Sequence, residues 1–478
     1  MRPRLPLATV AGPALGLLLA ACAQPAPRYP SEAYVPAGAH VPLDEYAARR
    51  ARLMDLVPDG VAVLPGATEP VASVPFRQNN DFFWLTGVEV PGAWLVVDGV
   101  ARRSTLLYSL DEHGAREAGL PLGLVRDAAA ATGMEVVLGD TAQELDALLT
   151  GLVGRSPVLY APHAPMELPR VTSAREELAT WRRTVGEDPW DGRPTREQQV
   201  VARLAGRFPD AELRDCSPFL WRLRKLKSPA EVALIRRAAQ LAVDAHLELM
   251  RSTEPGVEEQ ALAALFQFVC AKQGAQDLAY ATILMAGPHH PFGHYHRYDR
   301  TLEDGDLLIL DAGPDYAYYD ADVSTTFPVS GRFSPAQREL YELGEGIHRL
   351  CLEAYRPGRT LREVGSEIAA HLEARGLDPA DPRFRGLTTW GGYNHPIGLA
   401  THDVMPSVTG PDEPLEPGFV FACDINLPLE EELGIRIEDT VVITESGCEV
   451  LSAGLPRSVA AIEALMRERG LLQRVEGR

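Results

Sequence analysis

Short apolar runs alternate with helical patterns through the first part of the chain. Runs with the length and β-branching of strands are separated by segments whose apolar residues recur at helical spacing, the arrangement of an α/β domain. The expected strands are Val61–Leu64, Ala93–Val97, Leu106–Tyr108, Val136–Leu138 and Val158–Tyr160. The pattern therefore predicts an α/β N-terminal domain over residues 43–215.

One stretch of this domain, residues 76–87, mixes aromatic and polar side chains. It reads Phe-Arg-Gln-Asn-Asn-Asp-Phe-Phe-Trp-Leu-Thr-Gly. Such a stretch is either a binding rim or an aromatic core capped by polar residues. The pattern favours the core.

A capping signal marks the start of a second domain, which we expect over residues 228–466. Ser228 is followed by Pro229 at the first helical position and by Glu231 three residues on, which is a capping box. Apolar residues then recur at helical spacing into the 250s. The pattern predicts a long helix that opens this domain.

An apolar run in the second domain ends in a carboxylate. Leu307–Leu310 reads as a buried strand and leads directly into Asp311, which would be costly to desolvate alone. A turn at residues 313–315 and an aromatic strand over residues 316–319 predict a hairpin that returns Asp322 beside Asp311. An Asp after a strand is usually a turn residue, so this motif alone does not establish a ligand.

The same arrangement recurs later in the chain. Leu-Glu-x-Gly, an apolar run and Asp occur at 302–311 and again at 415–424, and Pro-Gly pairs occur at 255–256 and 357–358. Repetition of this kind indicates an internal duplication. A pseudo-twofold arrangement of the two halves would place Asp311 and Asp424 opposite each other and favours the ligand interpretation.

A further carboxylate, Glu438, lies in the second half of the duplication as Asp322 lies in the first. Arg436 and Glu438 share one face of an expected strand, with isoleucines on the other. Four converging carboxylates require cations, and oxygen ligands with one or two imidazoles suit a pair of Mn²⁺, Co²⁺ or Zn²⁺ ions. Such a pair can activate water and polarise a carbonyl, which predicts hydrolysis.

Several short motifs follow one another in a fixed order through the second domain. They are His294-Tyr295, Leu310-Asp311-Ala312-Gly313, the segment from Asp322 to Val329, His395 with His402-Asp403, and the segment from Gly434 to Asp439. Together they resemble the aminopeptidase P/prolidase family, and residues 76–87 resemble aminopeptidase P. The resemblance covers most of the mature chain. It implies an α+β pita-bread (creatinase/aminopeptidase-like) C-terminal domain with an internal pseudo-twofold duplication.

This resemblance implies a function and assigns roles to residues. We expect an Xaa-Pro aminopeptidase with two divalent metal ions, Mn²⁺ first and Co²⁺ or Zn²⁺ as alternatives, and a metal-bridging hydroxide as nucleophile. An Xaa-Pro dipeptidase of the prolidase type and a non-catalytic metal-binding module are the rival hypotheses. The implied metal ligands are Asp311, Asp322, His395, Asp424 and Glu438, with His294, His402 and Arg436 binding substrate and His294, His402 and Asp424 in catalytic roles.

Three positions depart from the family pattern. Asp424 stands where the family has Glu, so its carboxylate is one methylene shorter. Thr325 replaces a usual Arg, and Gly391 replaces a histidine that binds substrate in aminopeptidase P. These departures bear on proline specificity more than on metal binding.

The N-terminus and the charge bear on location and partners. Residues 1–21 read as an export signal, and Leu19-Ala20-Ala21-Cys22 is typical of a bacterial lipoprotein, with a soluble signal peptide as the alternative. Residues 22–42 then form a lipid-anchored tether, and the enzyme works on the periplasmic or cell-surface side. A net charge of −20 argues against a nucleic-acid partner. The expected partners are a peptide substrate and further copies of the chain in a homo-oligomer.

Overall fold

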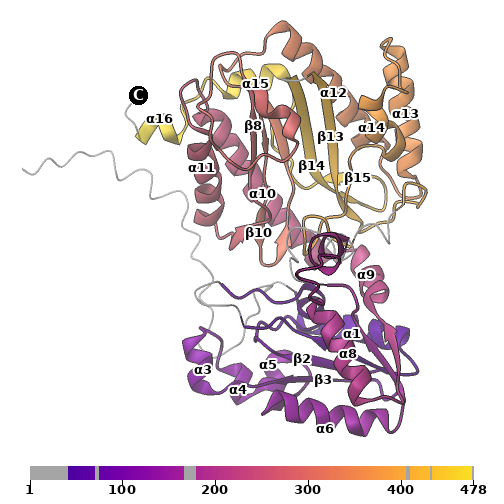
Figure 1. Ribbon diagram of the computed structural model, residues 1–478. Helices are drawn as coiled ribbons and strands as arrows, with labels where there is room; N and C mark the ends of the chain where they lie inside the picture. Colours follow the sequence, from indigo (N-terminus) through magenta and orange to yellow (C-terminus); the bar gives the residue numbers. More distant parts are fainter. Residues whose placement is uncertain (1–40, 70–74, 166–178, 405–409, 431–432, 476–478) are drawn as a thin grey trace, which may run out of the picture.

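The computed structural model describes residues 41–69, 75–165, 179–404, 410–430 and 433–475. The expected signal peptide, Cys22 and most of the expected tether lie outside these ranges (Figure 1). Among the described residues, no helix combines the length and the apolar character that crossing a membrane requires.

The N-terminal part of the chain forms a mixed six-stranded sheet in the order β4-β3-β2-β1-β5-β6. All five expected strands are confirmed, with boundaries shifted by a few residues. The sixth, β6, was not predicted, because its sequence Glu-Leu-Arg-Asp has little apolar character for an edge strand. The strands are β1 Val61–Pro65, β2 Trp94–Asp98, β3 Arg103–Tyr108, β4 Glu135–Leu138, β5 Val158–Ala161 and β6 Glu212–Asp215.

Helices lie on both sides of this sheet, and α9 leads from it toward the C-terminal part of the chain (Figure 1). They are α1 Leu43–Leu56, α2 Asn80–Thr86, α3 Glu112–Glu117, α4 Gly123–Arg126, α5 Ala128–Thr132, α6 Thr141–Val153, the π-helix η1 Arg182–Gly186, α8 Arg196–Arg207 and α9 Ser217–Lys225. The domain limits 43–215 and 228–466 stay predictions.

The aromatic stretch at residues 76–87 is a polar-capped core, as the pattern favoured. Every residue of α2 is buried, and the side chain of Asn79 caps the helix by accepting from the Phe82 amide. The stretch also joins the two parts of the chain. Phe83 stacks on Tyr318 with ring centroids 3.7 Å apart.

The C-terminal part is built on a six-stranded sheet in the order β13-β14-β12-β9-β8, with β15 paired to β14. A small separate sheet has the order β11-β10-β7. The strands are β7 Asp277–Leu278, β8 Ile283–Ala286, β9 Leu307–Asp311, β10 Pro314–Tyr316, β11 Tyr319–Asp320, β12 Ser324–Pro328, β13 Val420–Glu430, β14 Leu433–Ile443 and β15 Cys448–Val450.

Helices cover one face of the large sheet (Figure 1). Apolar residues of α10 to α13 pack with Cys423, Ile435 and Ile437 in one core, so the alternate residues of β13 and β14 point to the other face. Cys423 is fully buried, which confirms its expected core role. The helices are α10 Pro229–Ser252, α11 Glu259–Lys272, η2 Gly287–Phe292, α12 Pro335–Ala354, α13 Leu361–Ala374, η3 Pro382–Phe384, α14 Arg385–Trp390, α15 Val459–Leu465 and α16 Leu471–Val475.

The duplication inferred from the sequence reappears in the backbone hydrogen bonds. Gly256 N donates to Leu302 O at 2.8 Å, and Gly358 N donates to Leu415 O at 2.9 Å. The return bonds from Leu302 and Leu415 are also matched, at 2.8 and 2.7 Å. Helices α10 and α12 both begin with a capping box that has Pro in the first turn. Both halves supply strands to the same sheet, as predicted.

The turn expected at residues 313–315 is wrong in position. The structure turns two residues later, at Ala317 and Tyr318, which both have positive φ between the paired residues Tyr316 and Tyr319. Gly313 serves another purpose. A Cβ there would lie 1.7 Å from Ala321 O, so this glycine permits a close approach of two backbone segments.

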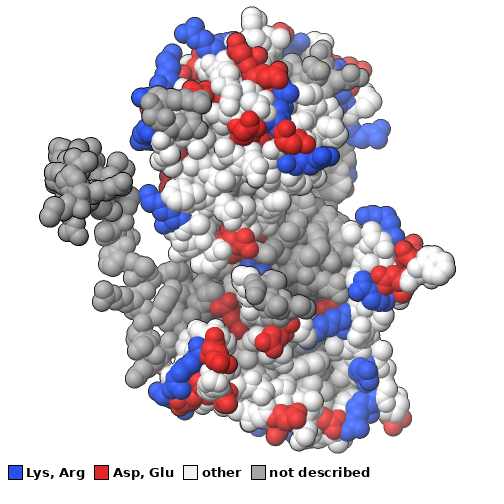
Figure 2. Space-filling view, turned by 60° about the vertical axis from the view of Figure 1, so that its left-hand side comes forward, with Lys and Arg blue, Asp and Glu red and all other residues white. Residues whose placement is uncertain are grey.

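Charged side chains of both signs are interspersed on the described surface. Figure 2 shows lysine and arginine mixed with aspartate and glutamate over one face of the two parts. Charge on this face therefore does not single out an interface.

Candidate metal centre and active site

Sheet register aligns three predicted ligands in one row. Asp424 on β13 pairs with Glu438 on β14, Glu438 pairs with Ser324 on β12, and Ser324 pairs with Asp311 at the end of β9. Paired residues of neighbouring strands project to the same face. The row thus lies on the face of the sheet opposite the helices.

Asp322 and His395 complete the cluster. His395 Nε2 lies 3.5 Å from Asp322 Oδ2 and 3.6 Å from Glu438 Oε1. One ligand atom from each of these three buried residues lies within 4.8 Å of the other two, a geometry that could hold a metal ion. His395 Nδ1 donates to Thr401 O at 3.0 Å, which leaves Nε2 as the nitrogen with the lone pair.

Two polar residues that sequence reasoning missed orient the carboxylates. The hydroxyl of Tyr280 lies within hydrogen-bond distance of both Asp311 Oδ1 and Asp322 Oδ1. Ser324 donates to Glu438 Oε2 at 2.7 Å. Tyr280 stands in the irregular segment before β8, so no periodic pattern points to it. For Ser324 a signal existed, because it immediately follows Asp322 and Val323 in the motif.

Arg436 brings a positive charge into contact with the cluster. Its Nη1 forms an ion pair with Asp311 Oδ2, and its Nη2 donates to Gly293 O at 3.1 Å. The guanidinium therefore links the Asp311 carboxylate to the segment that carries His294. The face shared by Arg436 and Glu438 agrees with the predicted strand alternation.

The buried carboxylates of the cluster repel one another. Burial, followed by repulsion from Asp311, raises the pKa of Glu438 to about 8. Burial and then Glu438 raise the pKa of Asp322, and the same two causes raise the pKa of Asp424, in each case well above the usual range. One guanidinium thus does not compensate four carboxylates.

The donor set fits a pair of divalent cations. Asp424 Oδ1 is buried and accepts no hydrogen bond, so it is an oxygen available to a cation. Four carboxylates and one imidazole are the hard ligands that Mn²⁺, Co²⁺ and Zn²⁺ accept in paired sites. The residues present therefore suit the metal ions that the sequence predicted.

The two predicted substrate histidines flank this cluster. The His402 ring lies 4.0 Å from the His395 ring, centroid to centroid, which places it beside a predicted ligand. His294 is exposed and directly follows Gly293, whose carbonyl accepts from Arg436. Both histidines therefore stand where a substrate at the cluster could meet them.

Two departures from the family pattern have local explanations. Thr325 points away from the carboxylates toward α10, where its hydroxyl donates to His246 Nδ1 at 2.9 Å while Nε2 donates to Ala312 O. Gly391 ends α14 with φ 66°, and a Cβ there would lie 2.9 Å from Leu361 O. A histidine at this position would be strained in the present backbone.

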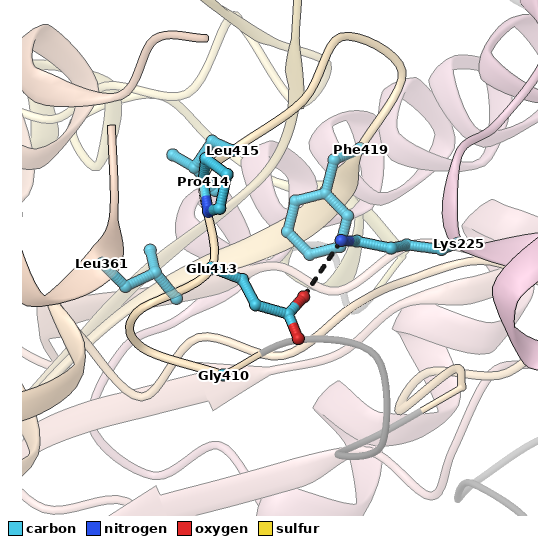
Figure 3. A pocket seen from close by; sticks show the side chains of 7 residues that line it. All are labelled: Lys225, Leu361, Gly410, Glu413, Pro414, Leu415 and Phe419. Carbon is cyan, nitrogen blue, oxygen red and sulfur yellow. Dashed lines mark hydrogen bonds and ion pairs between the residues drawn. The ribbon is translucent and has the colours of Figure 1, made fainter. Parts of the chain in front are cut away.

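A pocket elsewhere in the structure has a different character. Its lining is mostly apolar, crossed by an ion pair between Lys225 Nζ and Glu413 Oε2 at 3.1 Å (Figure 3). None of its lining residues belongs to the predicted site. They are Lys225, Leu361, Gly410, Glu413, Pro414, Leu415 and Phe419.

Comparison with known proteins gives matches over both parts of the chain. Residues 46–160 match the family described as "Aminopeptidase P, N-terminal domain", and residues 233–445 match "Metallopeptidase family M24". The Xaa-Pro aminopeptidase of Escherichia coli is 32% identical over 464 residues, covering 88% of this chain and 97% of that protein.

Solved structures give the same result. Aminopeptidase P from E. coli with the inhibitor Pro-Leu superposes with a TM-score of 0.71 at 29% identity, covering 89% of this chain and 98% of that one. Proline aminopeptidase P II from Yersinia pestis superposes with a TM-score of 0.72 at 29% identity, covering 89% and 100%. The likeness thus extends over nearly the full length of both proteins.

Proposed function

Because the chain belongs to the aminopeptidase P family of metallo-aminopeptidases, we propose that it removes the N-terminal residue from peptides with proline in second position. The E. coli relative is named as an enzyme with this specificity. The observation that carries the proposal is the convergence of Asp322, His395 and Glu438 within 4.8 Å on a sheet face that also bears Asp311 and Asp424. The dipeptidase and the non-catalytic module are not favoured.

The proposed ligands of the metal pair are Asp311, Asp322, His395, Asp424 and Glu438. Two divalent ions bound there would lower the pKa of a water molecule and polarise the scissile carbonyl. We propose Mn²⁺ as the resident ion, since the donors are mostly carboxylate oxygens. A zinc-substituted E. coli aminopeptidase P is among the similar structures, at 28% identity. Metal analysis of the purified protein would therefore have to distinguish Mn²⁺ from Zn²⁺.

The chain's own residues then position substrate and move the proton. His402 and His294 would donate hydrogen bonds to the oxygen that gains negative charge at the attacked carbonyl. Asp424 would hold the proton removed from water and pass it to the leaving nitrogen. Arg436 would fix Asp311 and lie beside the proline-binding region.

The proposed specificity is tested with matched peptides. The purified protein, loaded with Mn²⁺, is given Xaa-Pro, Xaa-Pro-Yaa and Xaa-Ala-Yaa, and the products are identified by mass. Release of Xaa from Xaa-Pro-Yaa with slower cleavage of Xaa-Ala-Yaa is the expected result. Cleavage of Xaa-Pro alone would instead indicate the dipeptidase.

Replacing His402 by Ala should leave the metals bound and lower kcat by roughly 10²–10³-fold, the usual cost of one oxyanion donor. The His402 ring lies beside His395, with centroids 4.0 Å apart, and is not among the proposed ligands. Metal content and kcat are measured on the same preparation. An H402A protein that loses its metal would show that His402 acts as a ligand.

Replacing Asp424 by Glu should maintain or raise peptidase activity. The added methylene restores the length that the family pattern has at this position, and Oδ1 of Asp424 is buried and accepts no hydrogen bond, so the change breaks none at that oxygen. The comparison is kcat/KM of both proteins on Xaa-Pro-Yaa. A clear fall in D424E would mean that the site is shaped around Asp for another substrate.

The location and assembly of the protein are further proposals. We propose that Cys22 is lipidated after removal of residues 1–21 and that residues 22–42 tether the enzyme outside the cytoplasm. Mass spectrometry of the mature protein should find a lipid-modified Cys22, and an unmodified N-terminus elsewhere would contradict this. The homo-oligomer also stays a prediction, which sedimentation would test.

A further inference from the structure

A second group of metal-ligand side chains lies outside the carboxylate cluster. Glu259, His289 and Asp299 each offer a ligand atom within 4.8 Å of the other two. They come from three segments: the first residue of α11, the helix η2, and the stretch that follows His294. Nothing in the proposed reaction uses these three residues.

The distance between two of these residues is compatible with a shared metal ion. His289 Nδ1 lies 3.4 Å from Glu259 Oε1, beyond the usual range for N–H···O. Two ligands on one tetrahedral zinc ion, each bonded at about 2.0–2.1 Å, lie roughly 3.3 Å apart. The separation in this structure is therefore close to that of two ligands on one ion.

The carboxylate of Glu259 is fully buried and only partly compensated. Its side chain is 0% exposed, and apart from His289 it accepts hydrogen bonds from the backbone of Arg300, at 3.3 Å, and of Ala286. The Arg300 guanidinium is turned to Asp306, at 2.9 Å. A buried carboxylate favours a close cation, so the position calls for one.

The other two ligands are oriented by a common neighbour. The His289 ring stacks on Tyr295 with centroids 3.9 Å apart, and the Tyr295 hydroxyl donates to Asp299 Oδ1. The backbone next to Asp299 is also held against α11, because Glu259 N donates to the carbonyl oxygen of Arg300 at 3.0 Å. These contacts hold the His289 imidazole and the Asp299 carboxylate near Glu259.

We propose that Glu259, His289 and Asp299 bind one divalent transition-metal ion, Zn²⁺ being the best match. Two carboxylates and an imidazole would balance its charge. Asp299 Oδ2 also pairs with Arg297 at 3.2 Å, and the Asp299 side chain is 47% exposed, so water can reach this side of the group and could supply a fourth ligand. His289 and Asp299 stand five residues before and after His294. The ion would therefore hold both ends of the segment that carries His294, which links it to the proposed peptidase site.

Metal counting tests this site independently of activity. The full-length protein and the variant His289→Ala are dialysed against buffered Zn²⁺, and zinc per chain is measured. We expect one ion fewer in H289A. The variant His296→Ala removes an exposed histidine of the same segment that is outside the group, and it should bind as much zinc as the unchanged protein.

Two further variants separate this site from the carboxylate cluster. Asp299→Asn, at an exposed position, should also lose one ion. Glu438→Ala should lose zinc from the carboxylate cluster. Combining Glu438→Ala with H289A should remove one ion more than Glu438→Ala alone. Because each comparison measures a difference of one zinc ion, the test does not depend on how many ions the carboxylate cluster binds. Equal zinc in the unchanged protein, H289A and D299N would overturn the proposal.

Discussion

Replacing Glu438 by Ala is expected to cost the protein metal and nearly all of its turnover. Glu438 is paired with Asp424 across the sheet, lies 3.6 Å from His395 Nε2 and belongs to the group whose ligand atoms converge. Its loss should lower kcat by more than the roughly 10²–10³-fold expected for one oxyanion donor, since it removes a ligand and not a single hydrogen bond. Metal content and kcat are measured together.

The metal-free form of this variant should not unfold more easily. Burial and repulsion from Asp311 raise the pKa of Glu438 to about 8, so near neutral pH the metal-free fold has to keep this carboxyl protonated, a cost to folding that the alanine abolishes. Asp304→Ala, which removes an exposed carboxylate in the turn before β9, is the matched control and should keep both metal and activity. An E438A protein with full turnover would show that Glu438 is not part of the reaction centre.

Replacing Arg224 by Met should destabilise the protein by about 3–5 kcal/mol, the usual cost of leaving a buried charge without its partner. Arg224 Nη1 pairs with Asp81 Oδ1 at 2.6 Å, and its Nη2 pairs with Asp403, all three side chains being at most 4% exposed. Without Arg224, Asp403 would keep its ion pair with Lys227 at 3.1 Å, whereas Asp81 would lose its ion pair. Urea unfolding followed by circular dichroism measures the loss.

An exposed ion pair supplies the control for this prediction. Arg236 pairs with Glu449, both with 40% or more of the side chain exposed, so Arg236→Met should cost no more than about 1 kcal/mol. Equal losses in R224M and R236M would contradict the role of the buried pair. Because Asp403 follows His402, R224M should also reduce activity at temperatures where it remains folded.

Local and periodic features of the fold were predictable from the sequence. The five strands of the first sheet, the Ser228 capping box and the burial of Cys423 each depend on neighbours within a few residues, so their patterns are visible along the chain. The duplication was visible for the same reason, because two copies of one motif repeat the same spacing. The gathering of the carboxylates followed from it.

Features that depend on distant contacts were not predictable. Tyr280 reaches Asp311 and Asp322 from an irregular segment, and its role follows only from the folded chain. The hairpin turn falls at Ala317 and Tyr318, which seldom adopt positive φ, because Tyr318 packs on Phe83 of the other part of the chain. Tertiary packing there outweighs the turn preference of Gly-Pro.

The account depends most on the carboxylate cluster being a hydrolytic two-metal centre. The direct test is the turnover of an Xaa-Pro-Yaa tripeptide by metal-free protein as Mn²⁺ is added back in measured equivalents. We expect no cleavage at the start, a rise with added metal and saturation once the cluster holds two ions. Protein that binds no metal and hydrolyses no peptide with Mn²⁺, Co²⁺ or Zn²⁺ would contradict the account and leave the non-catalytic module.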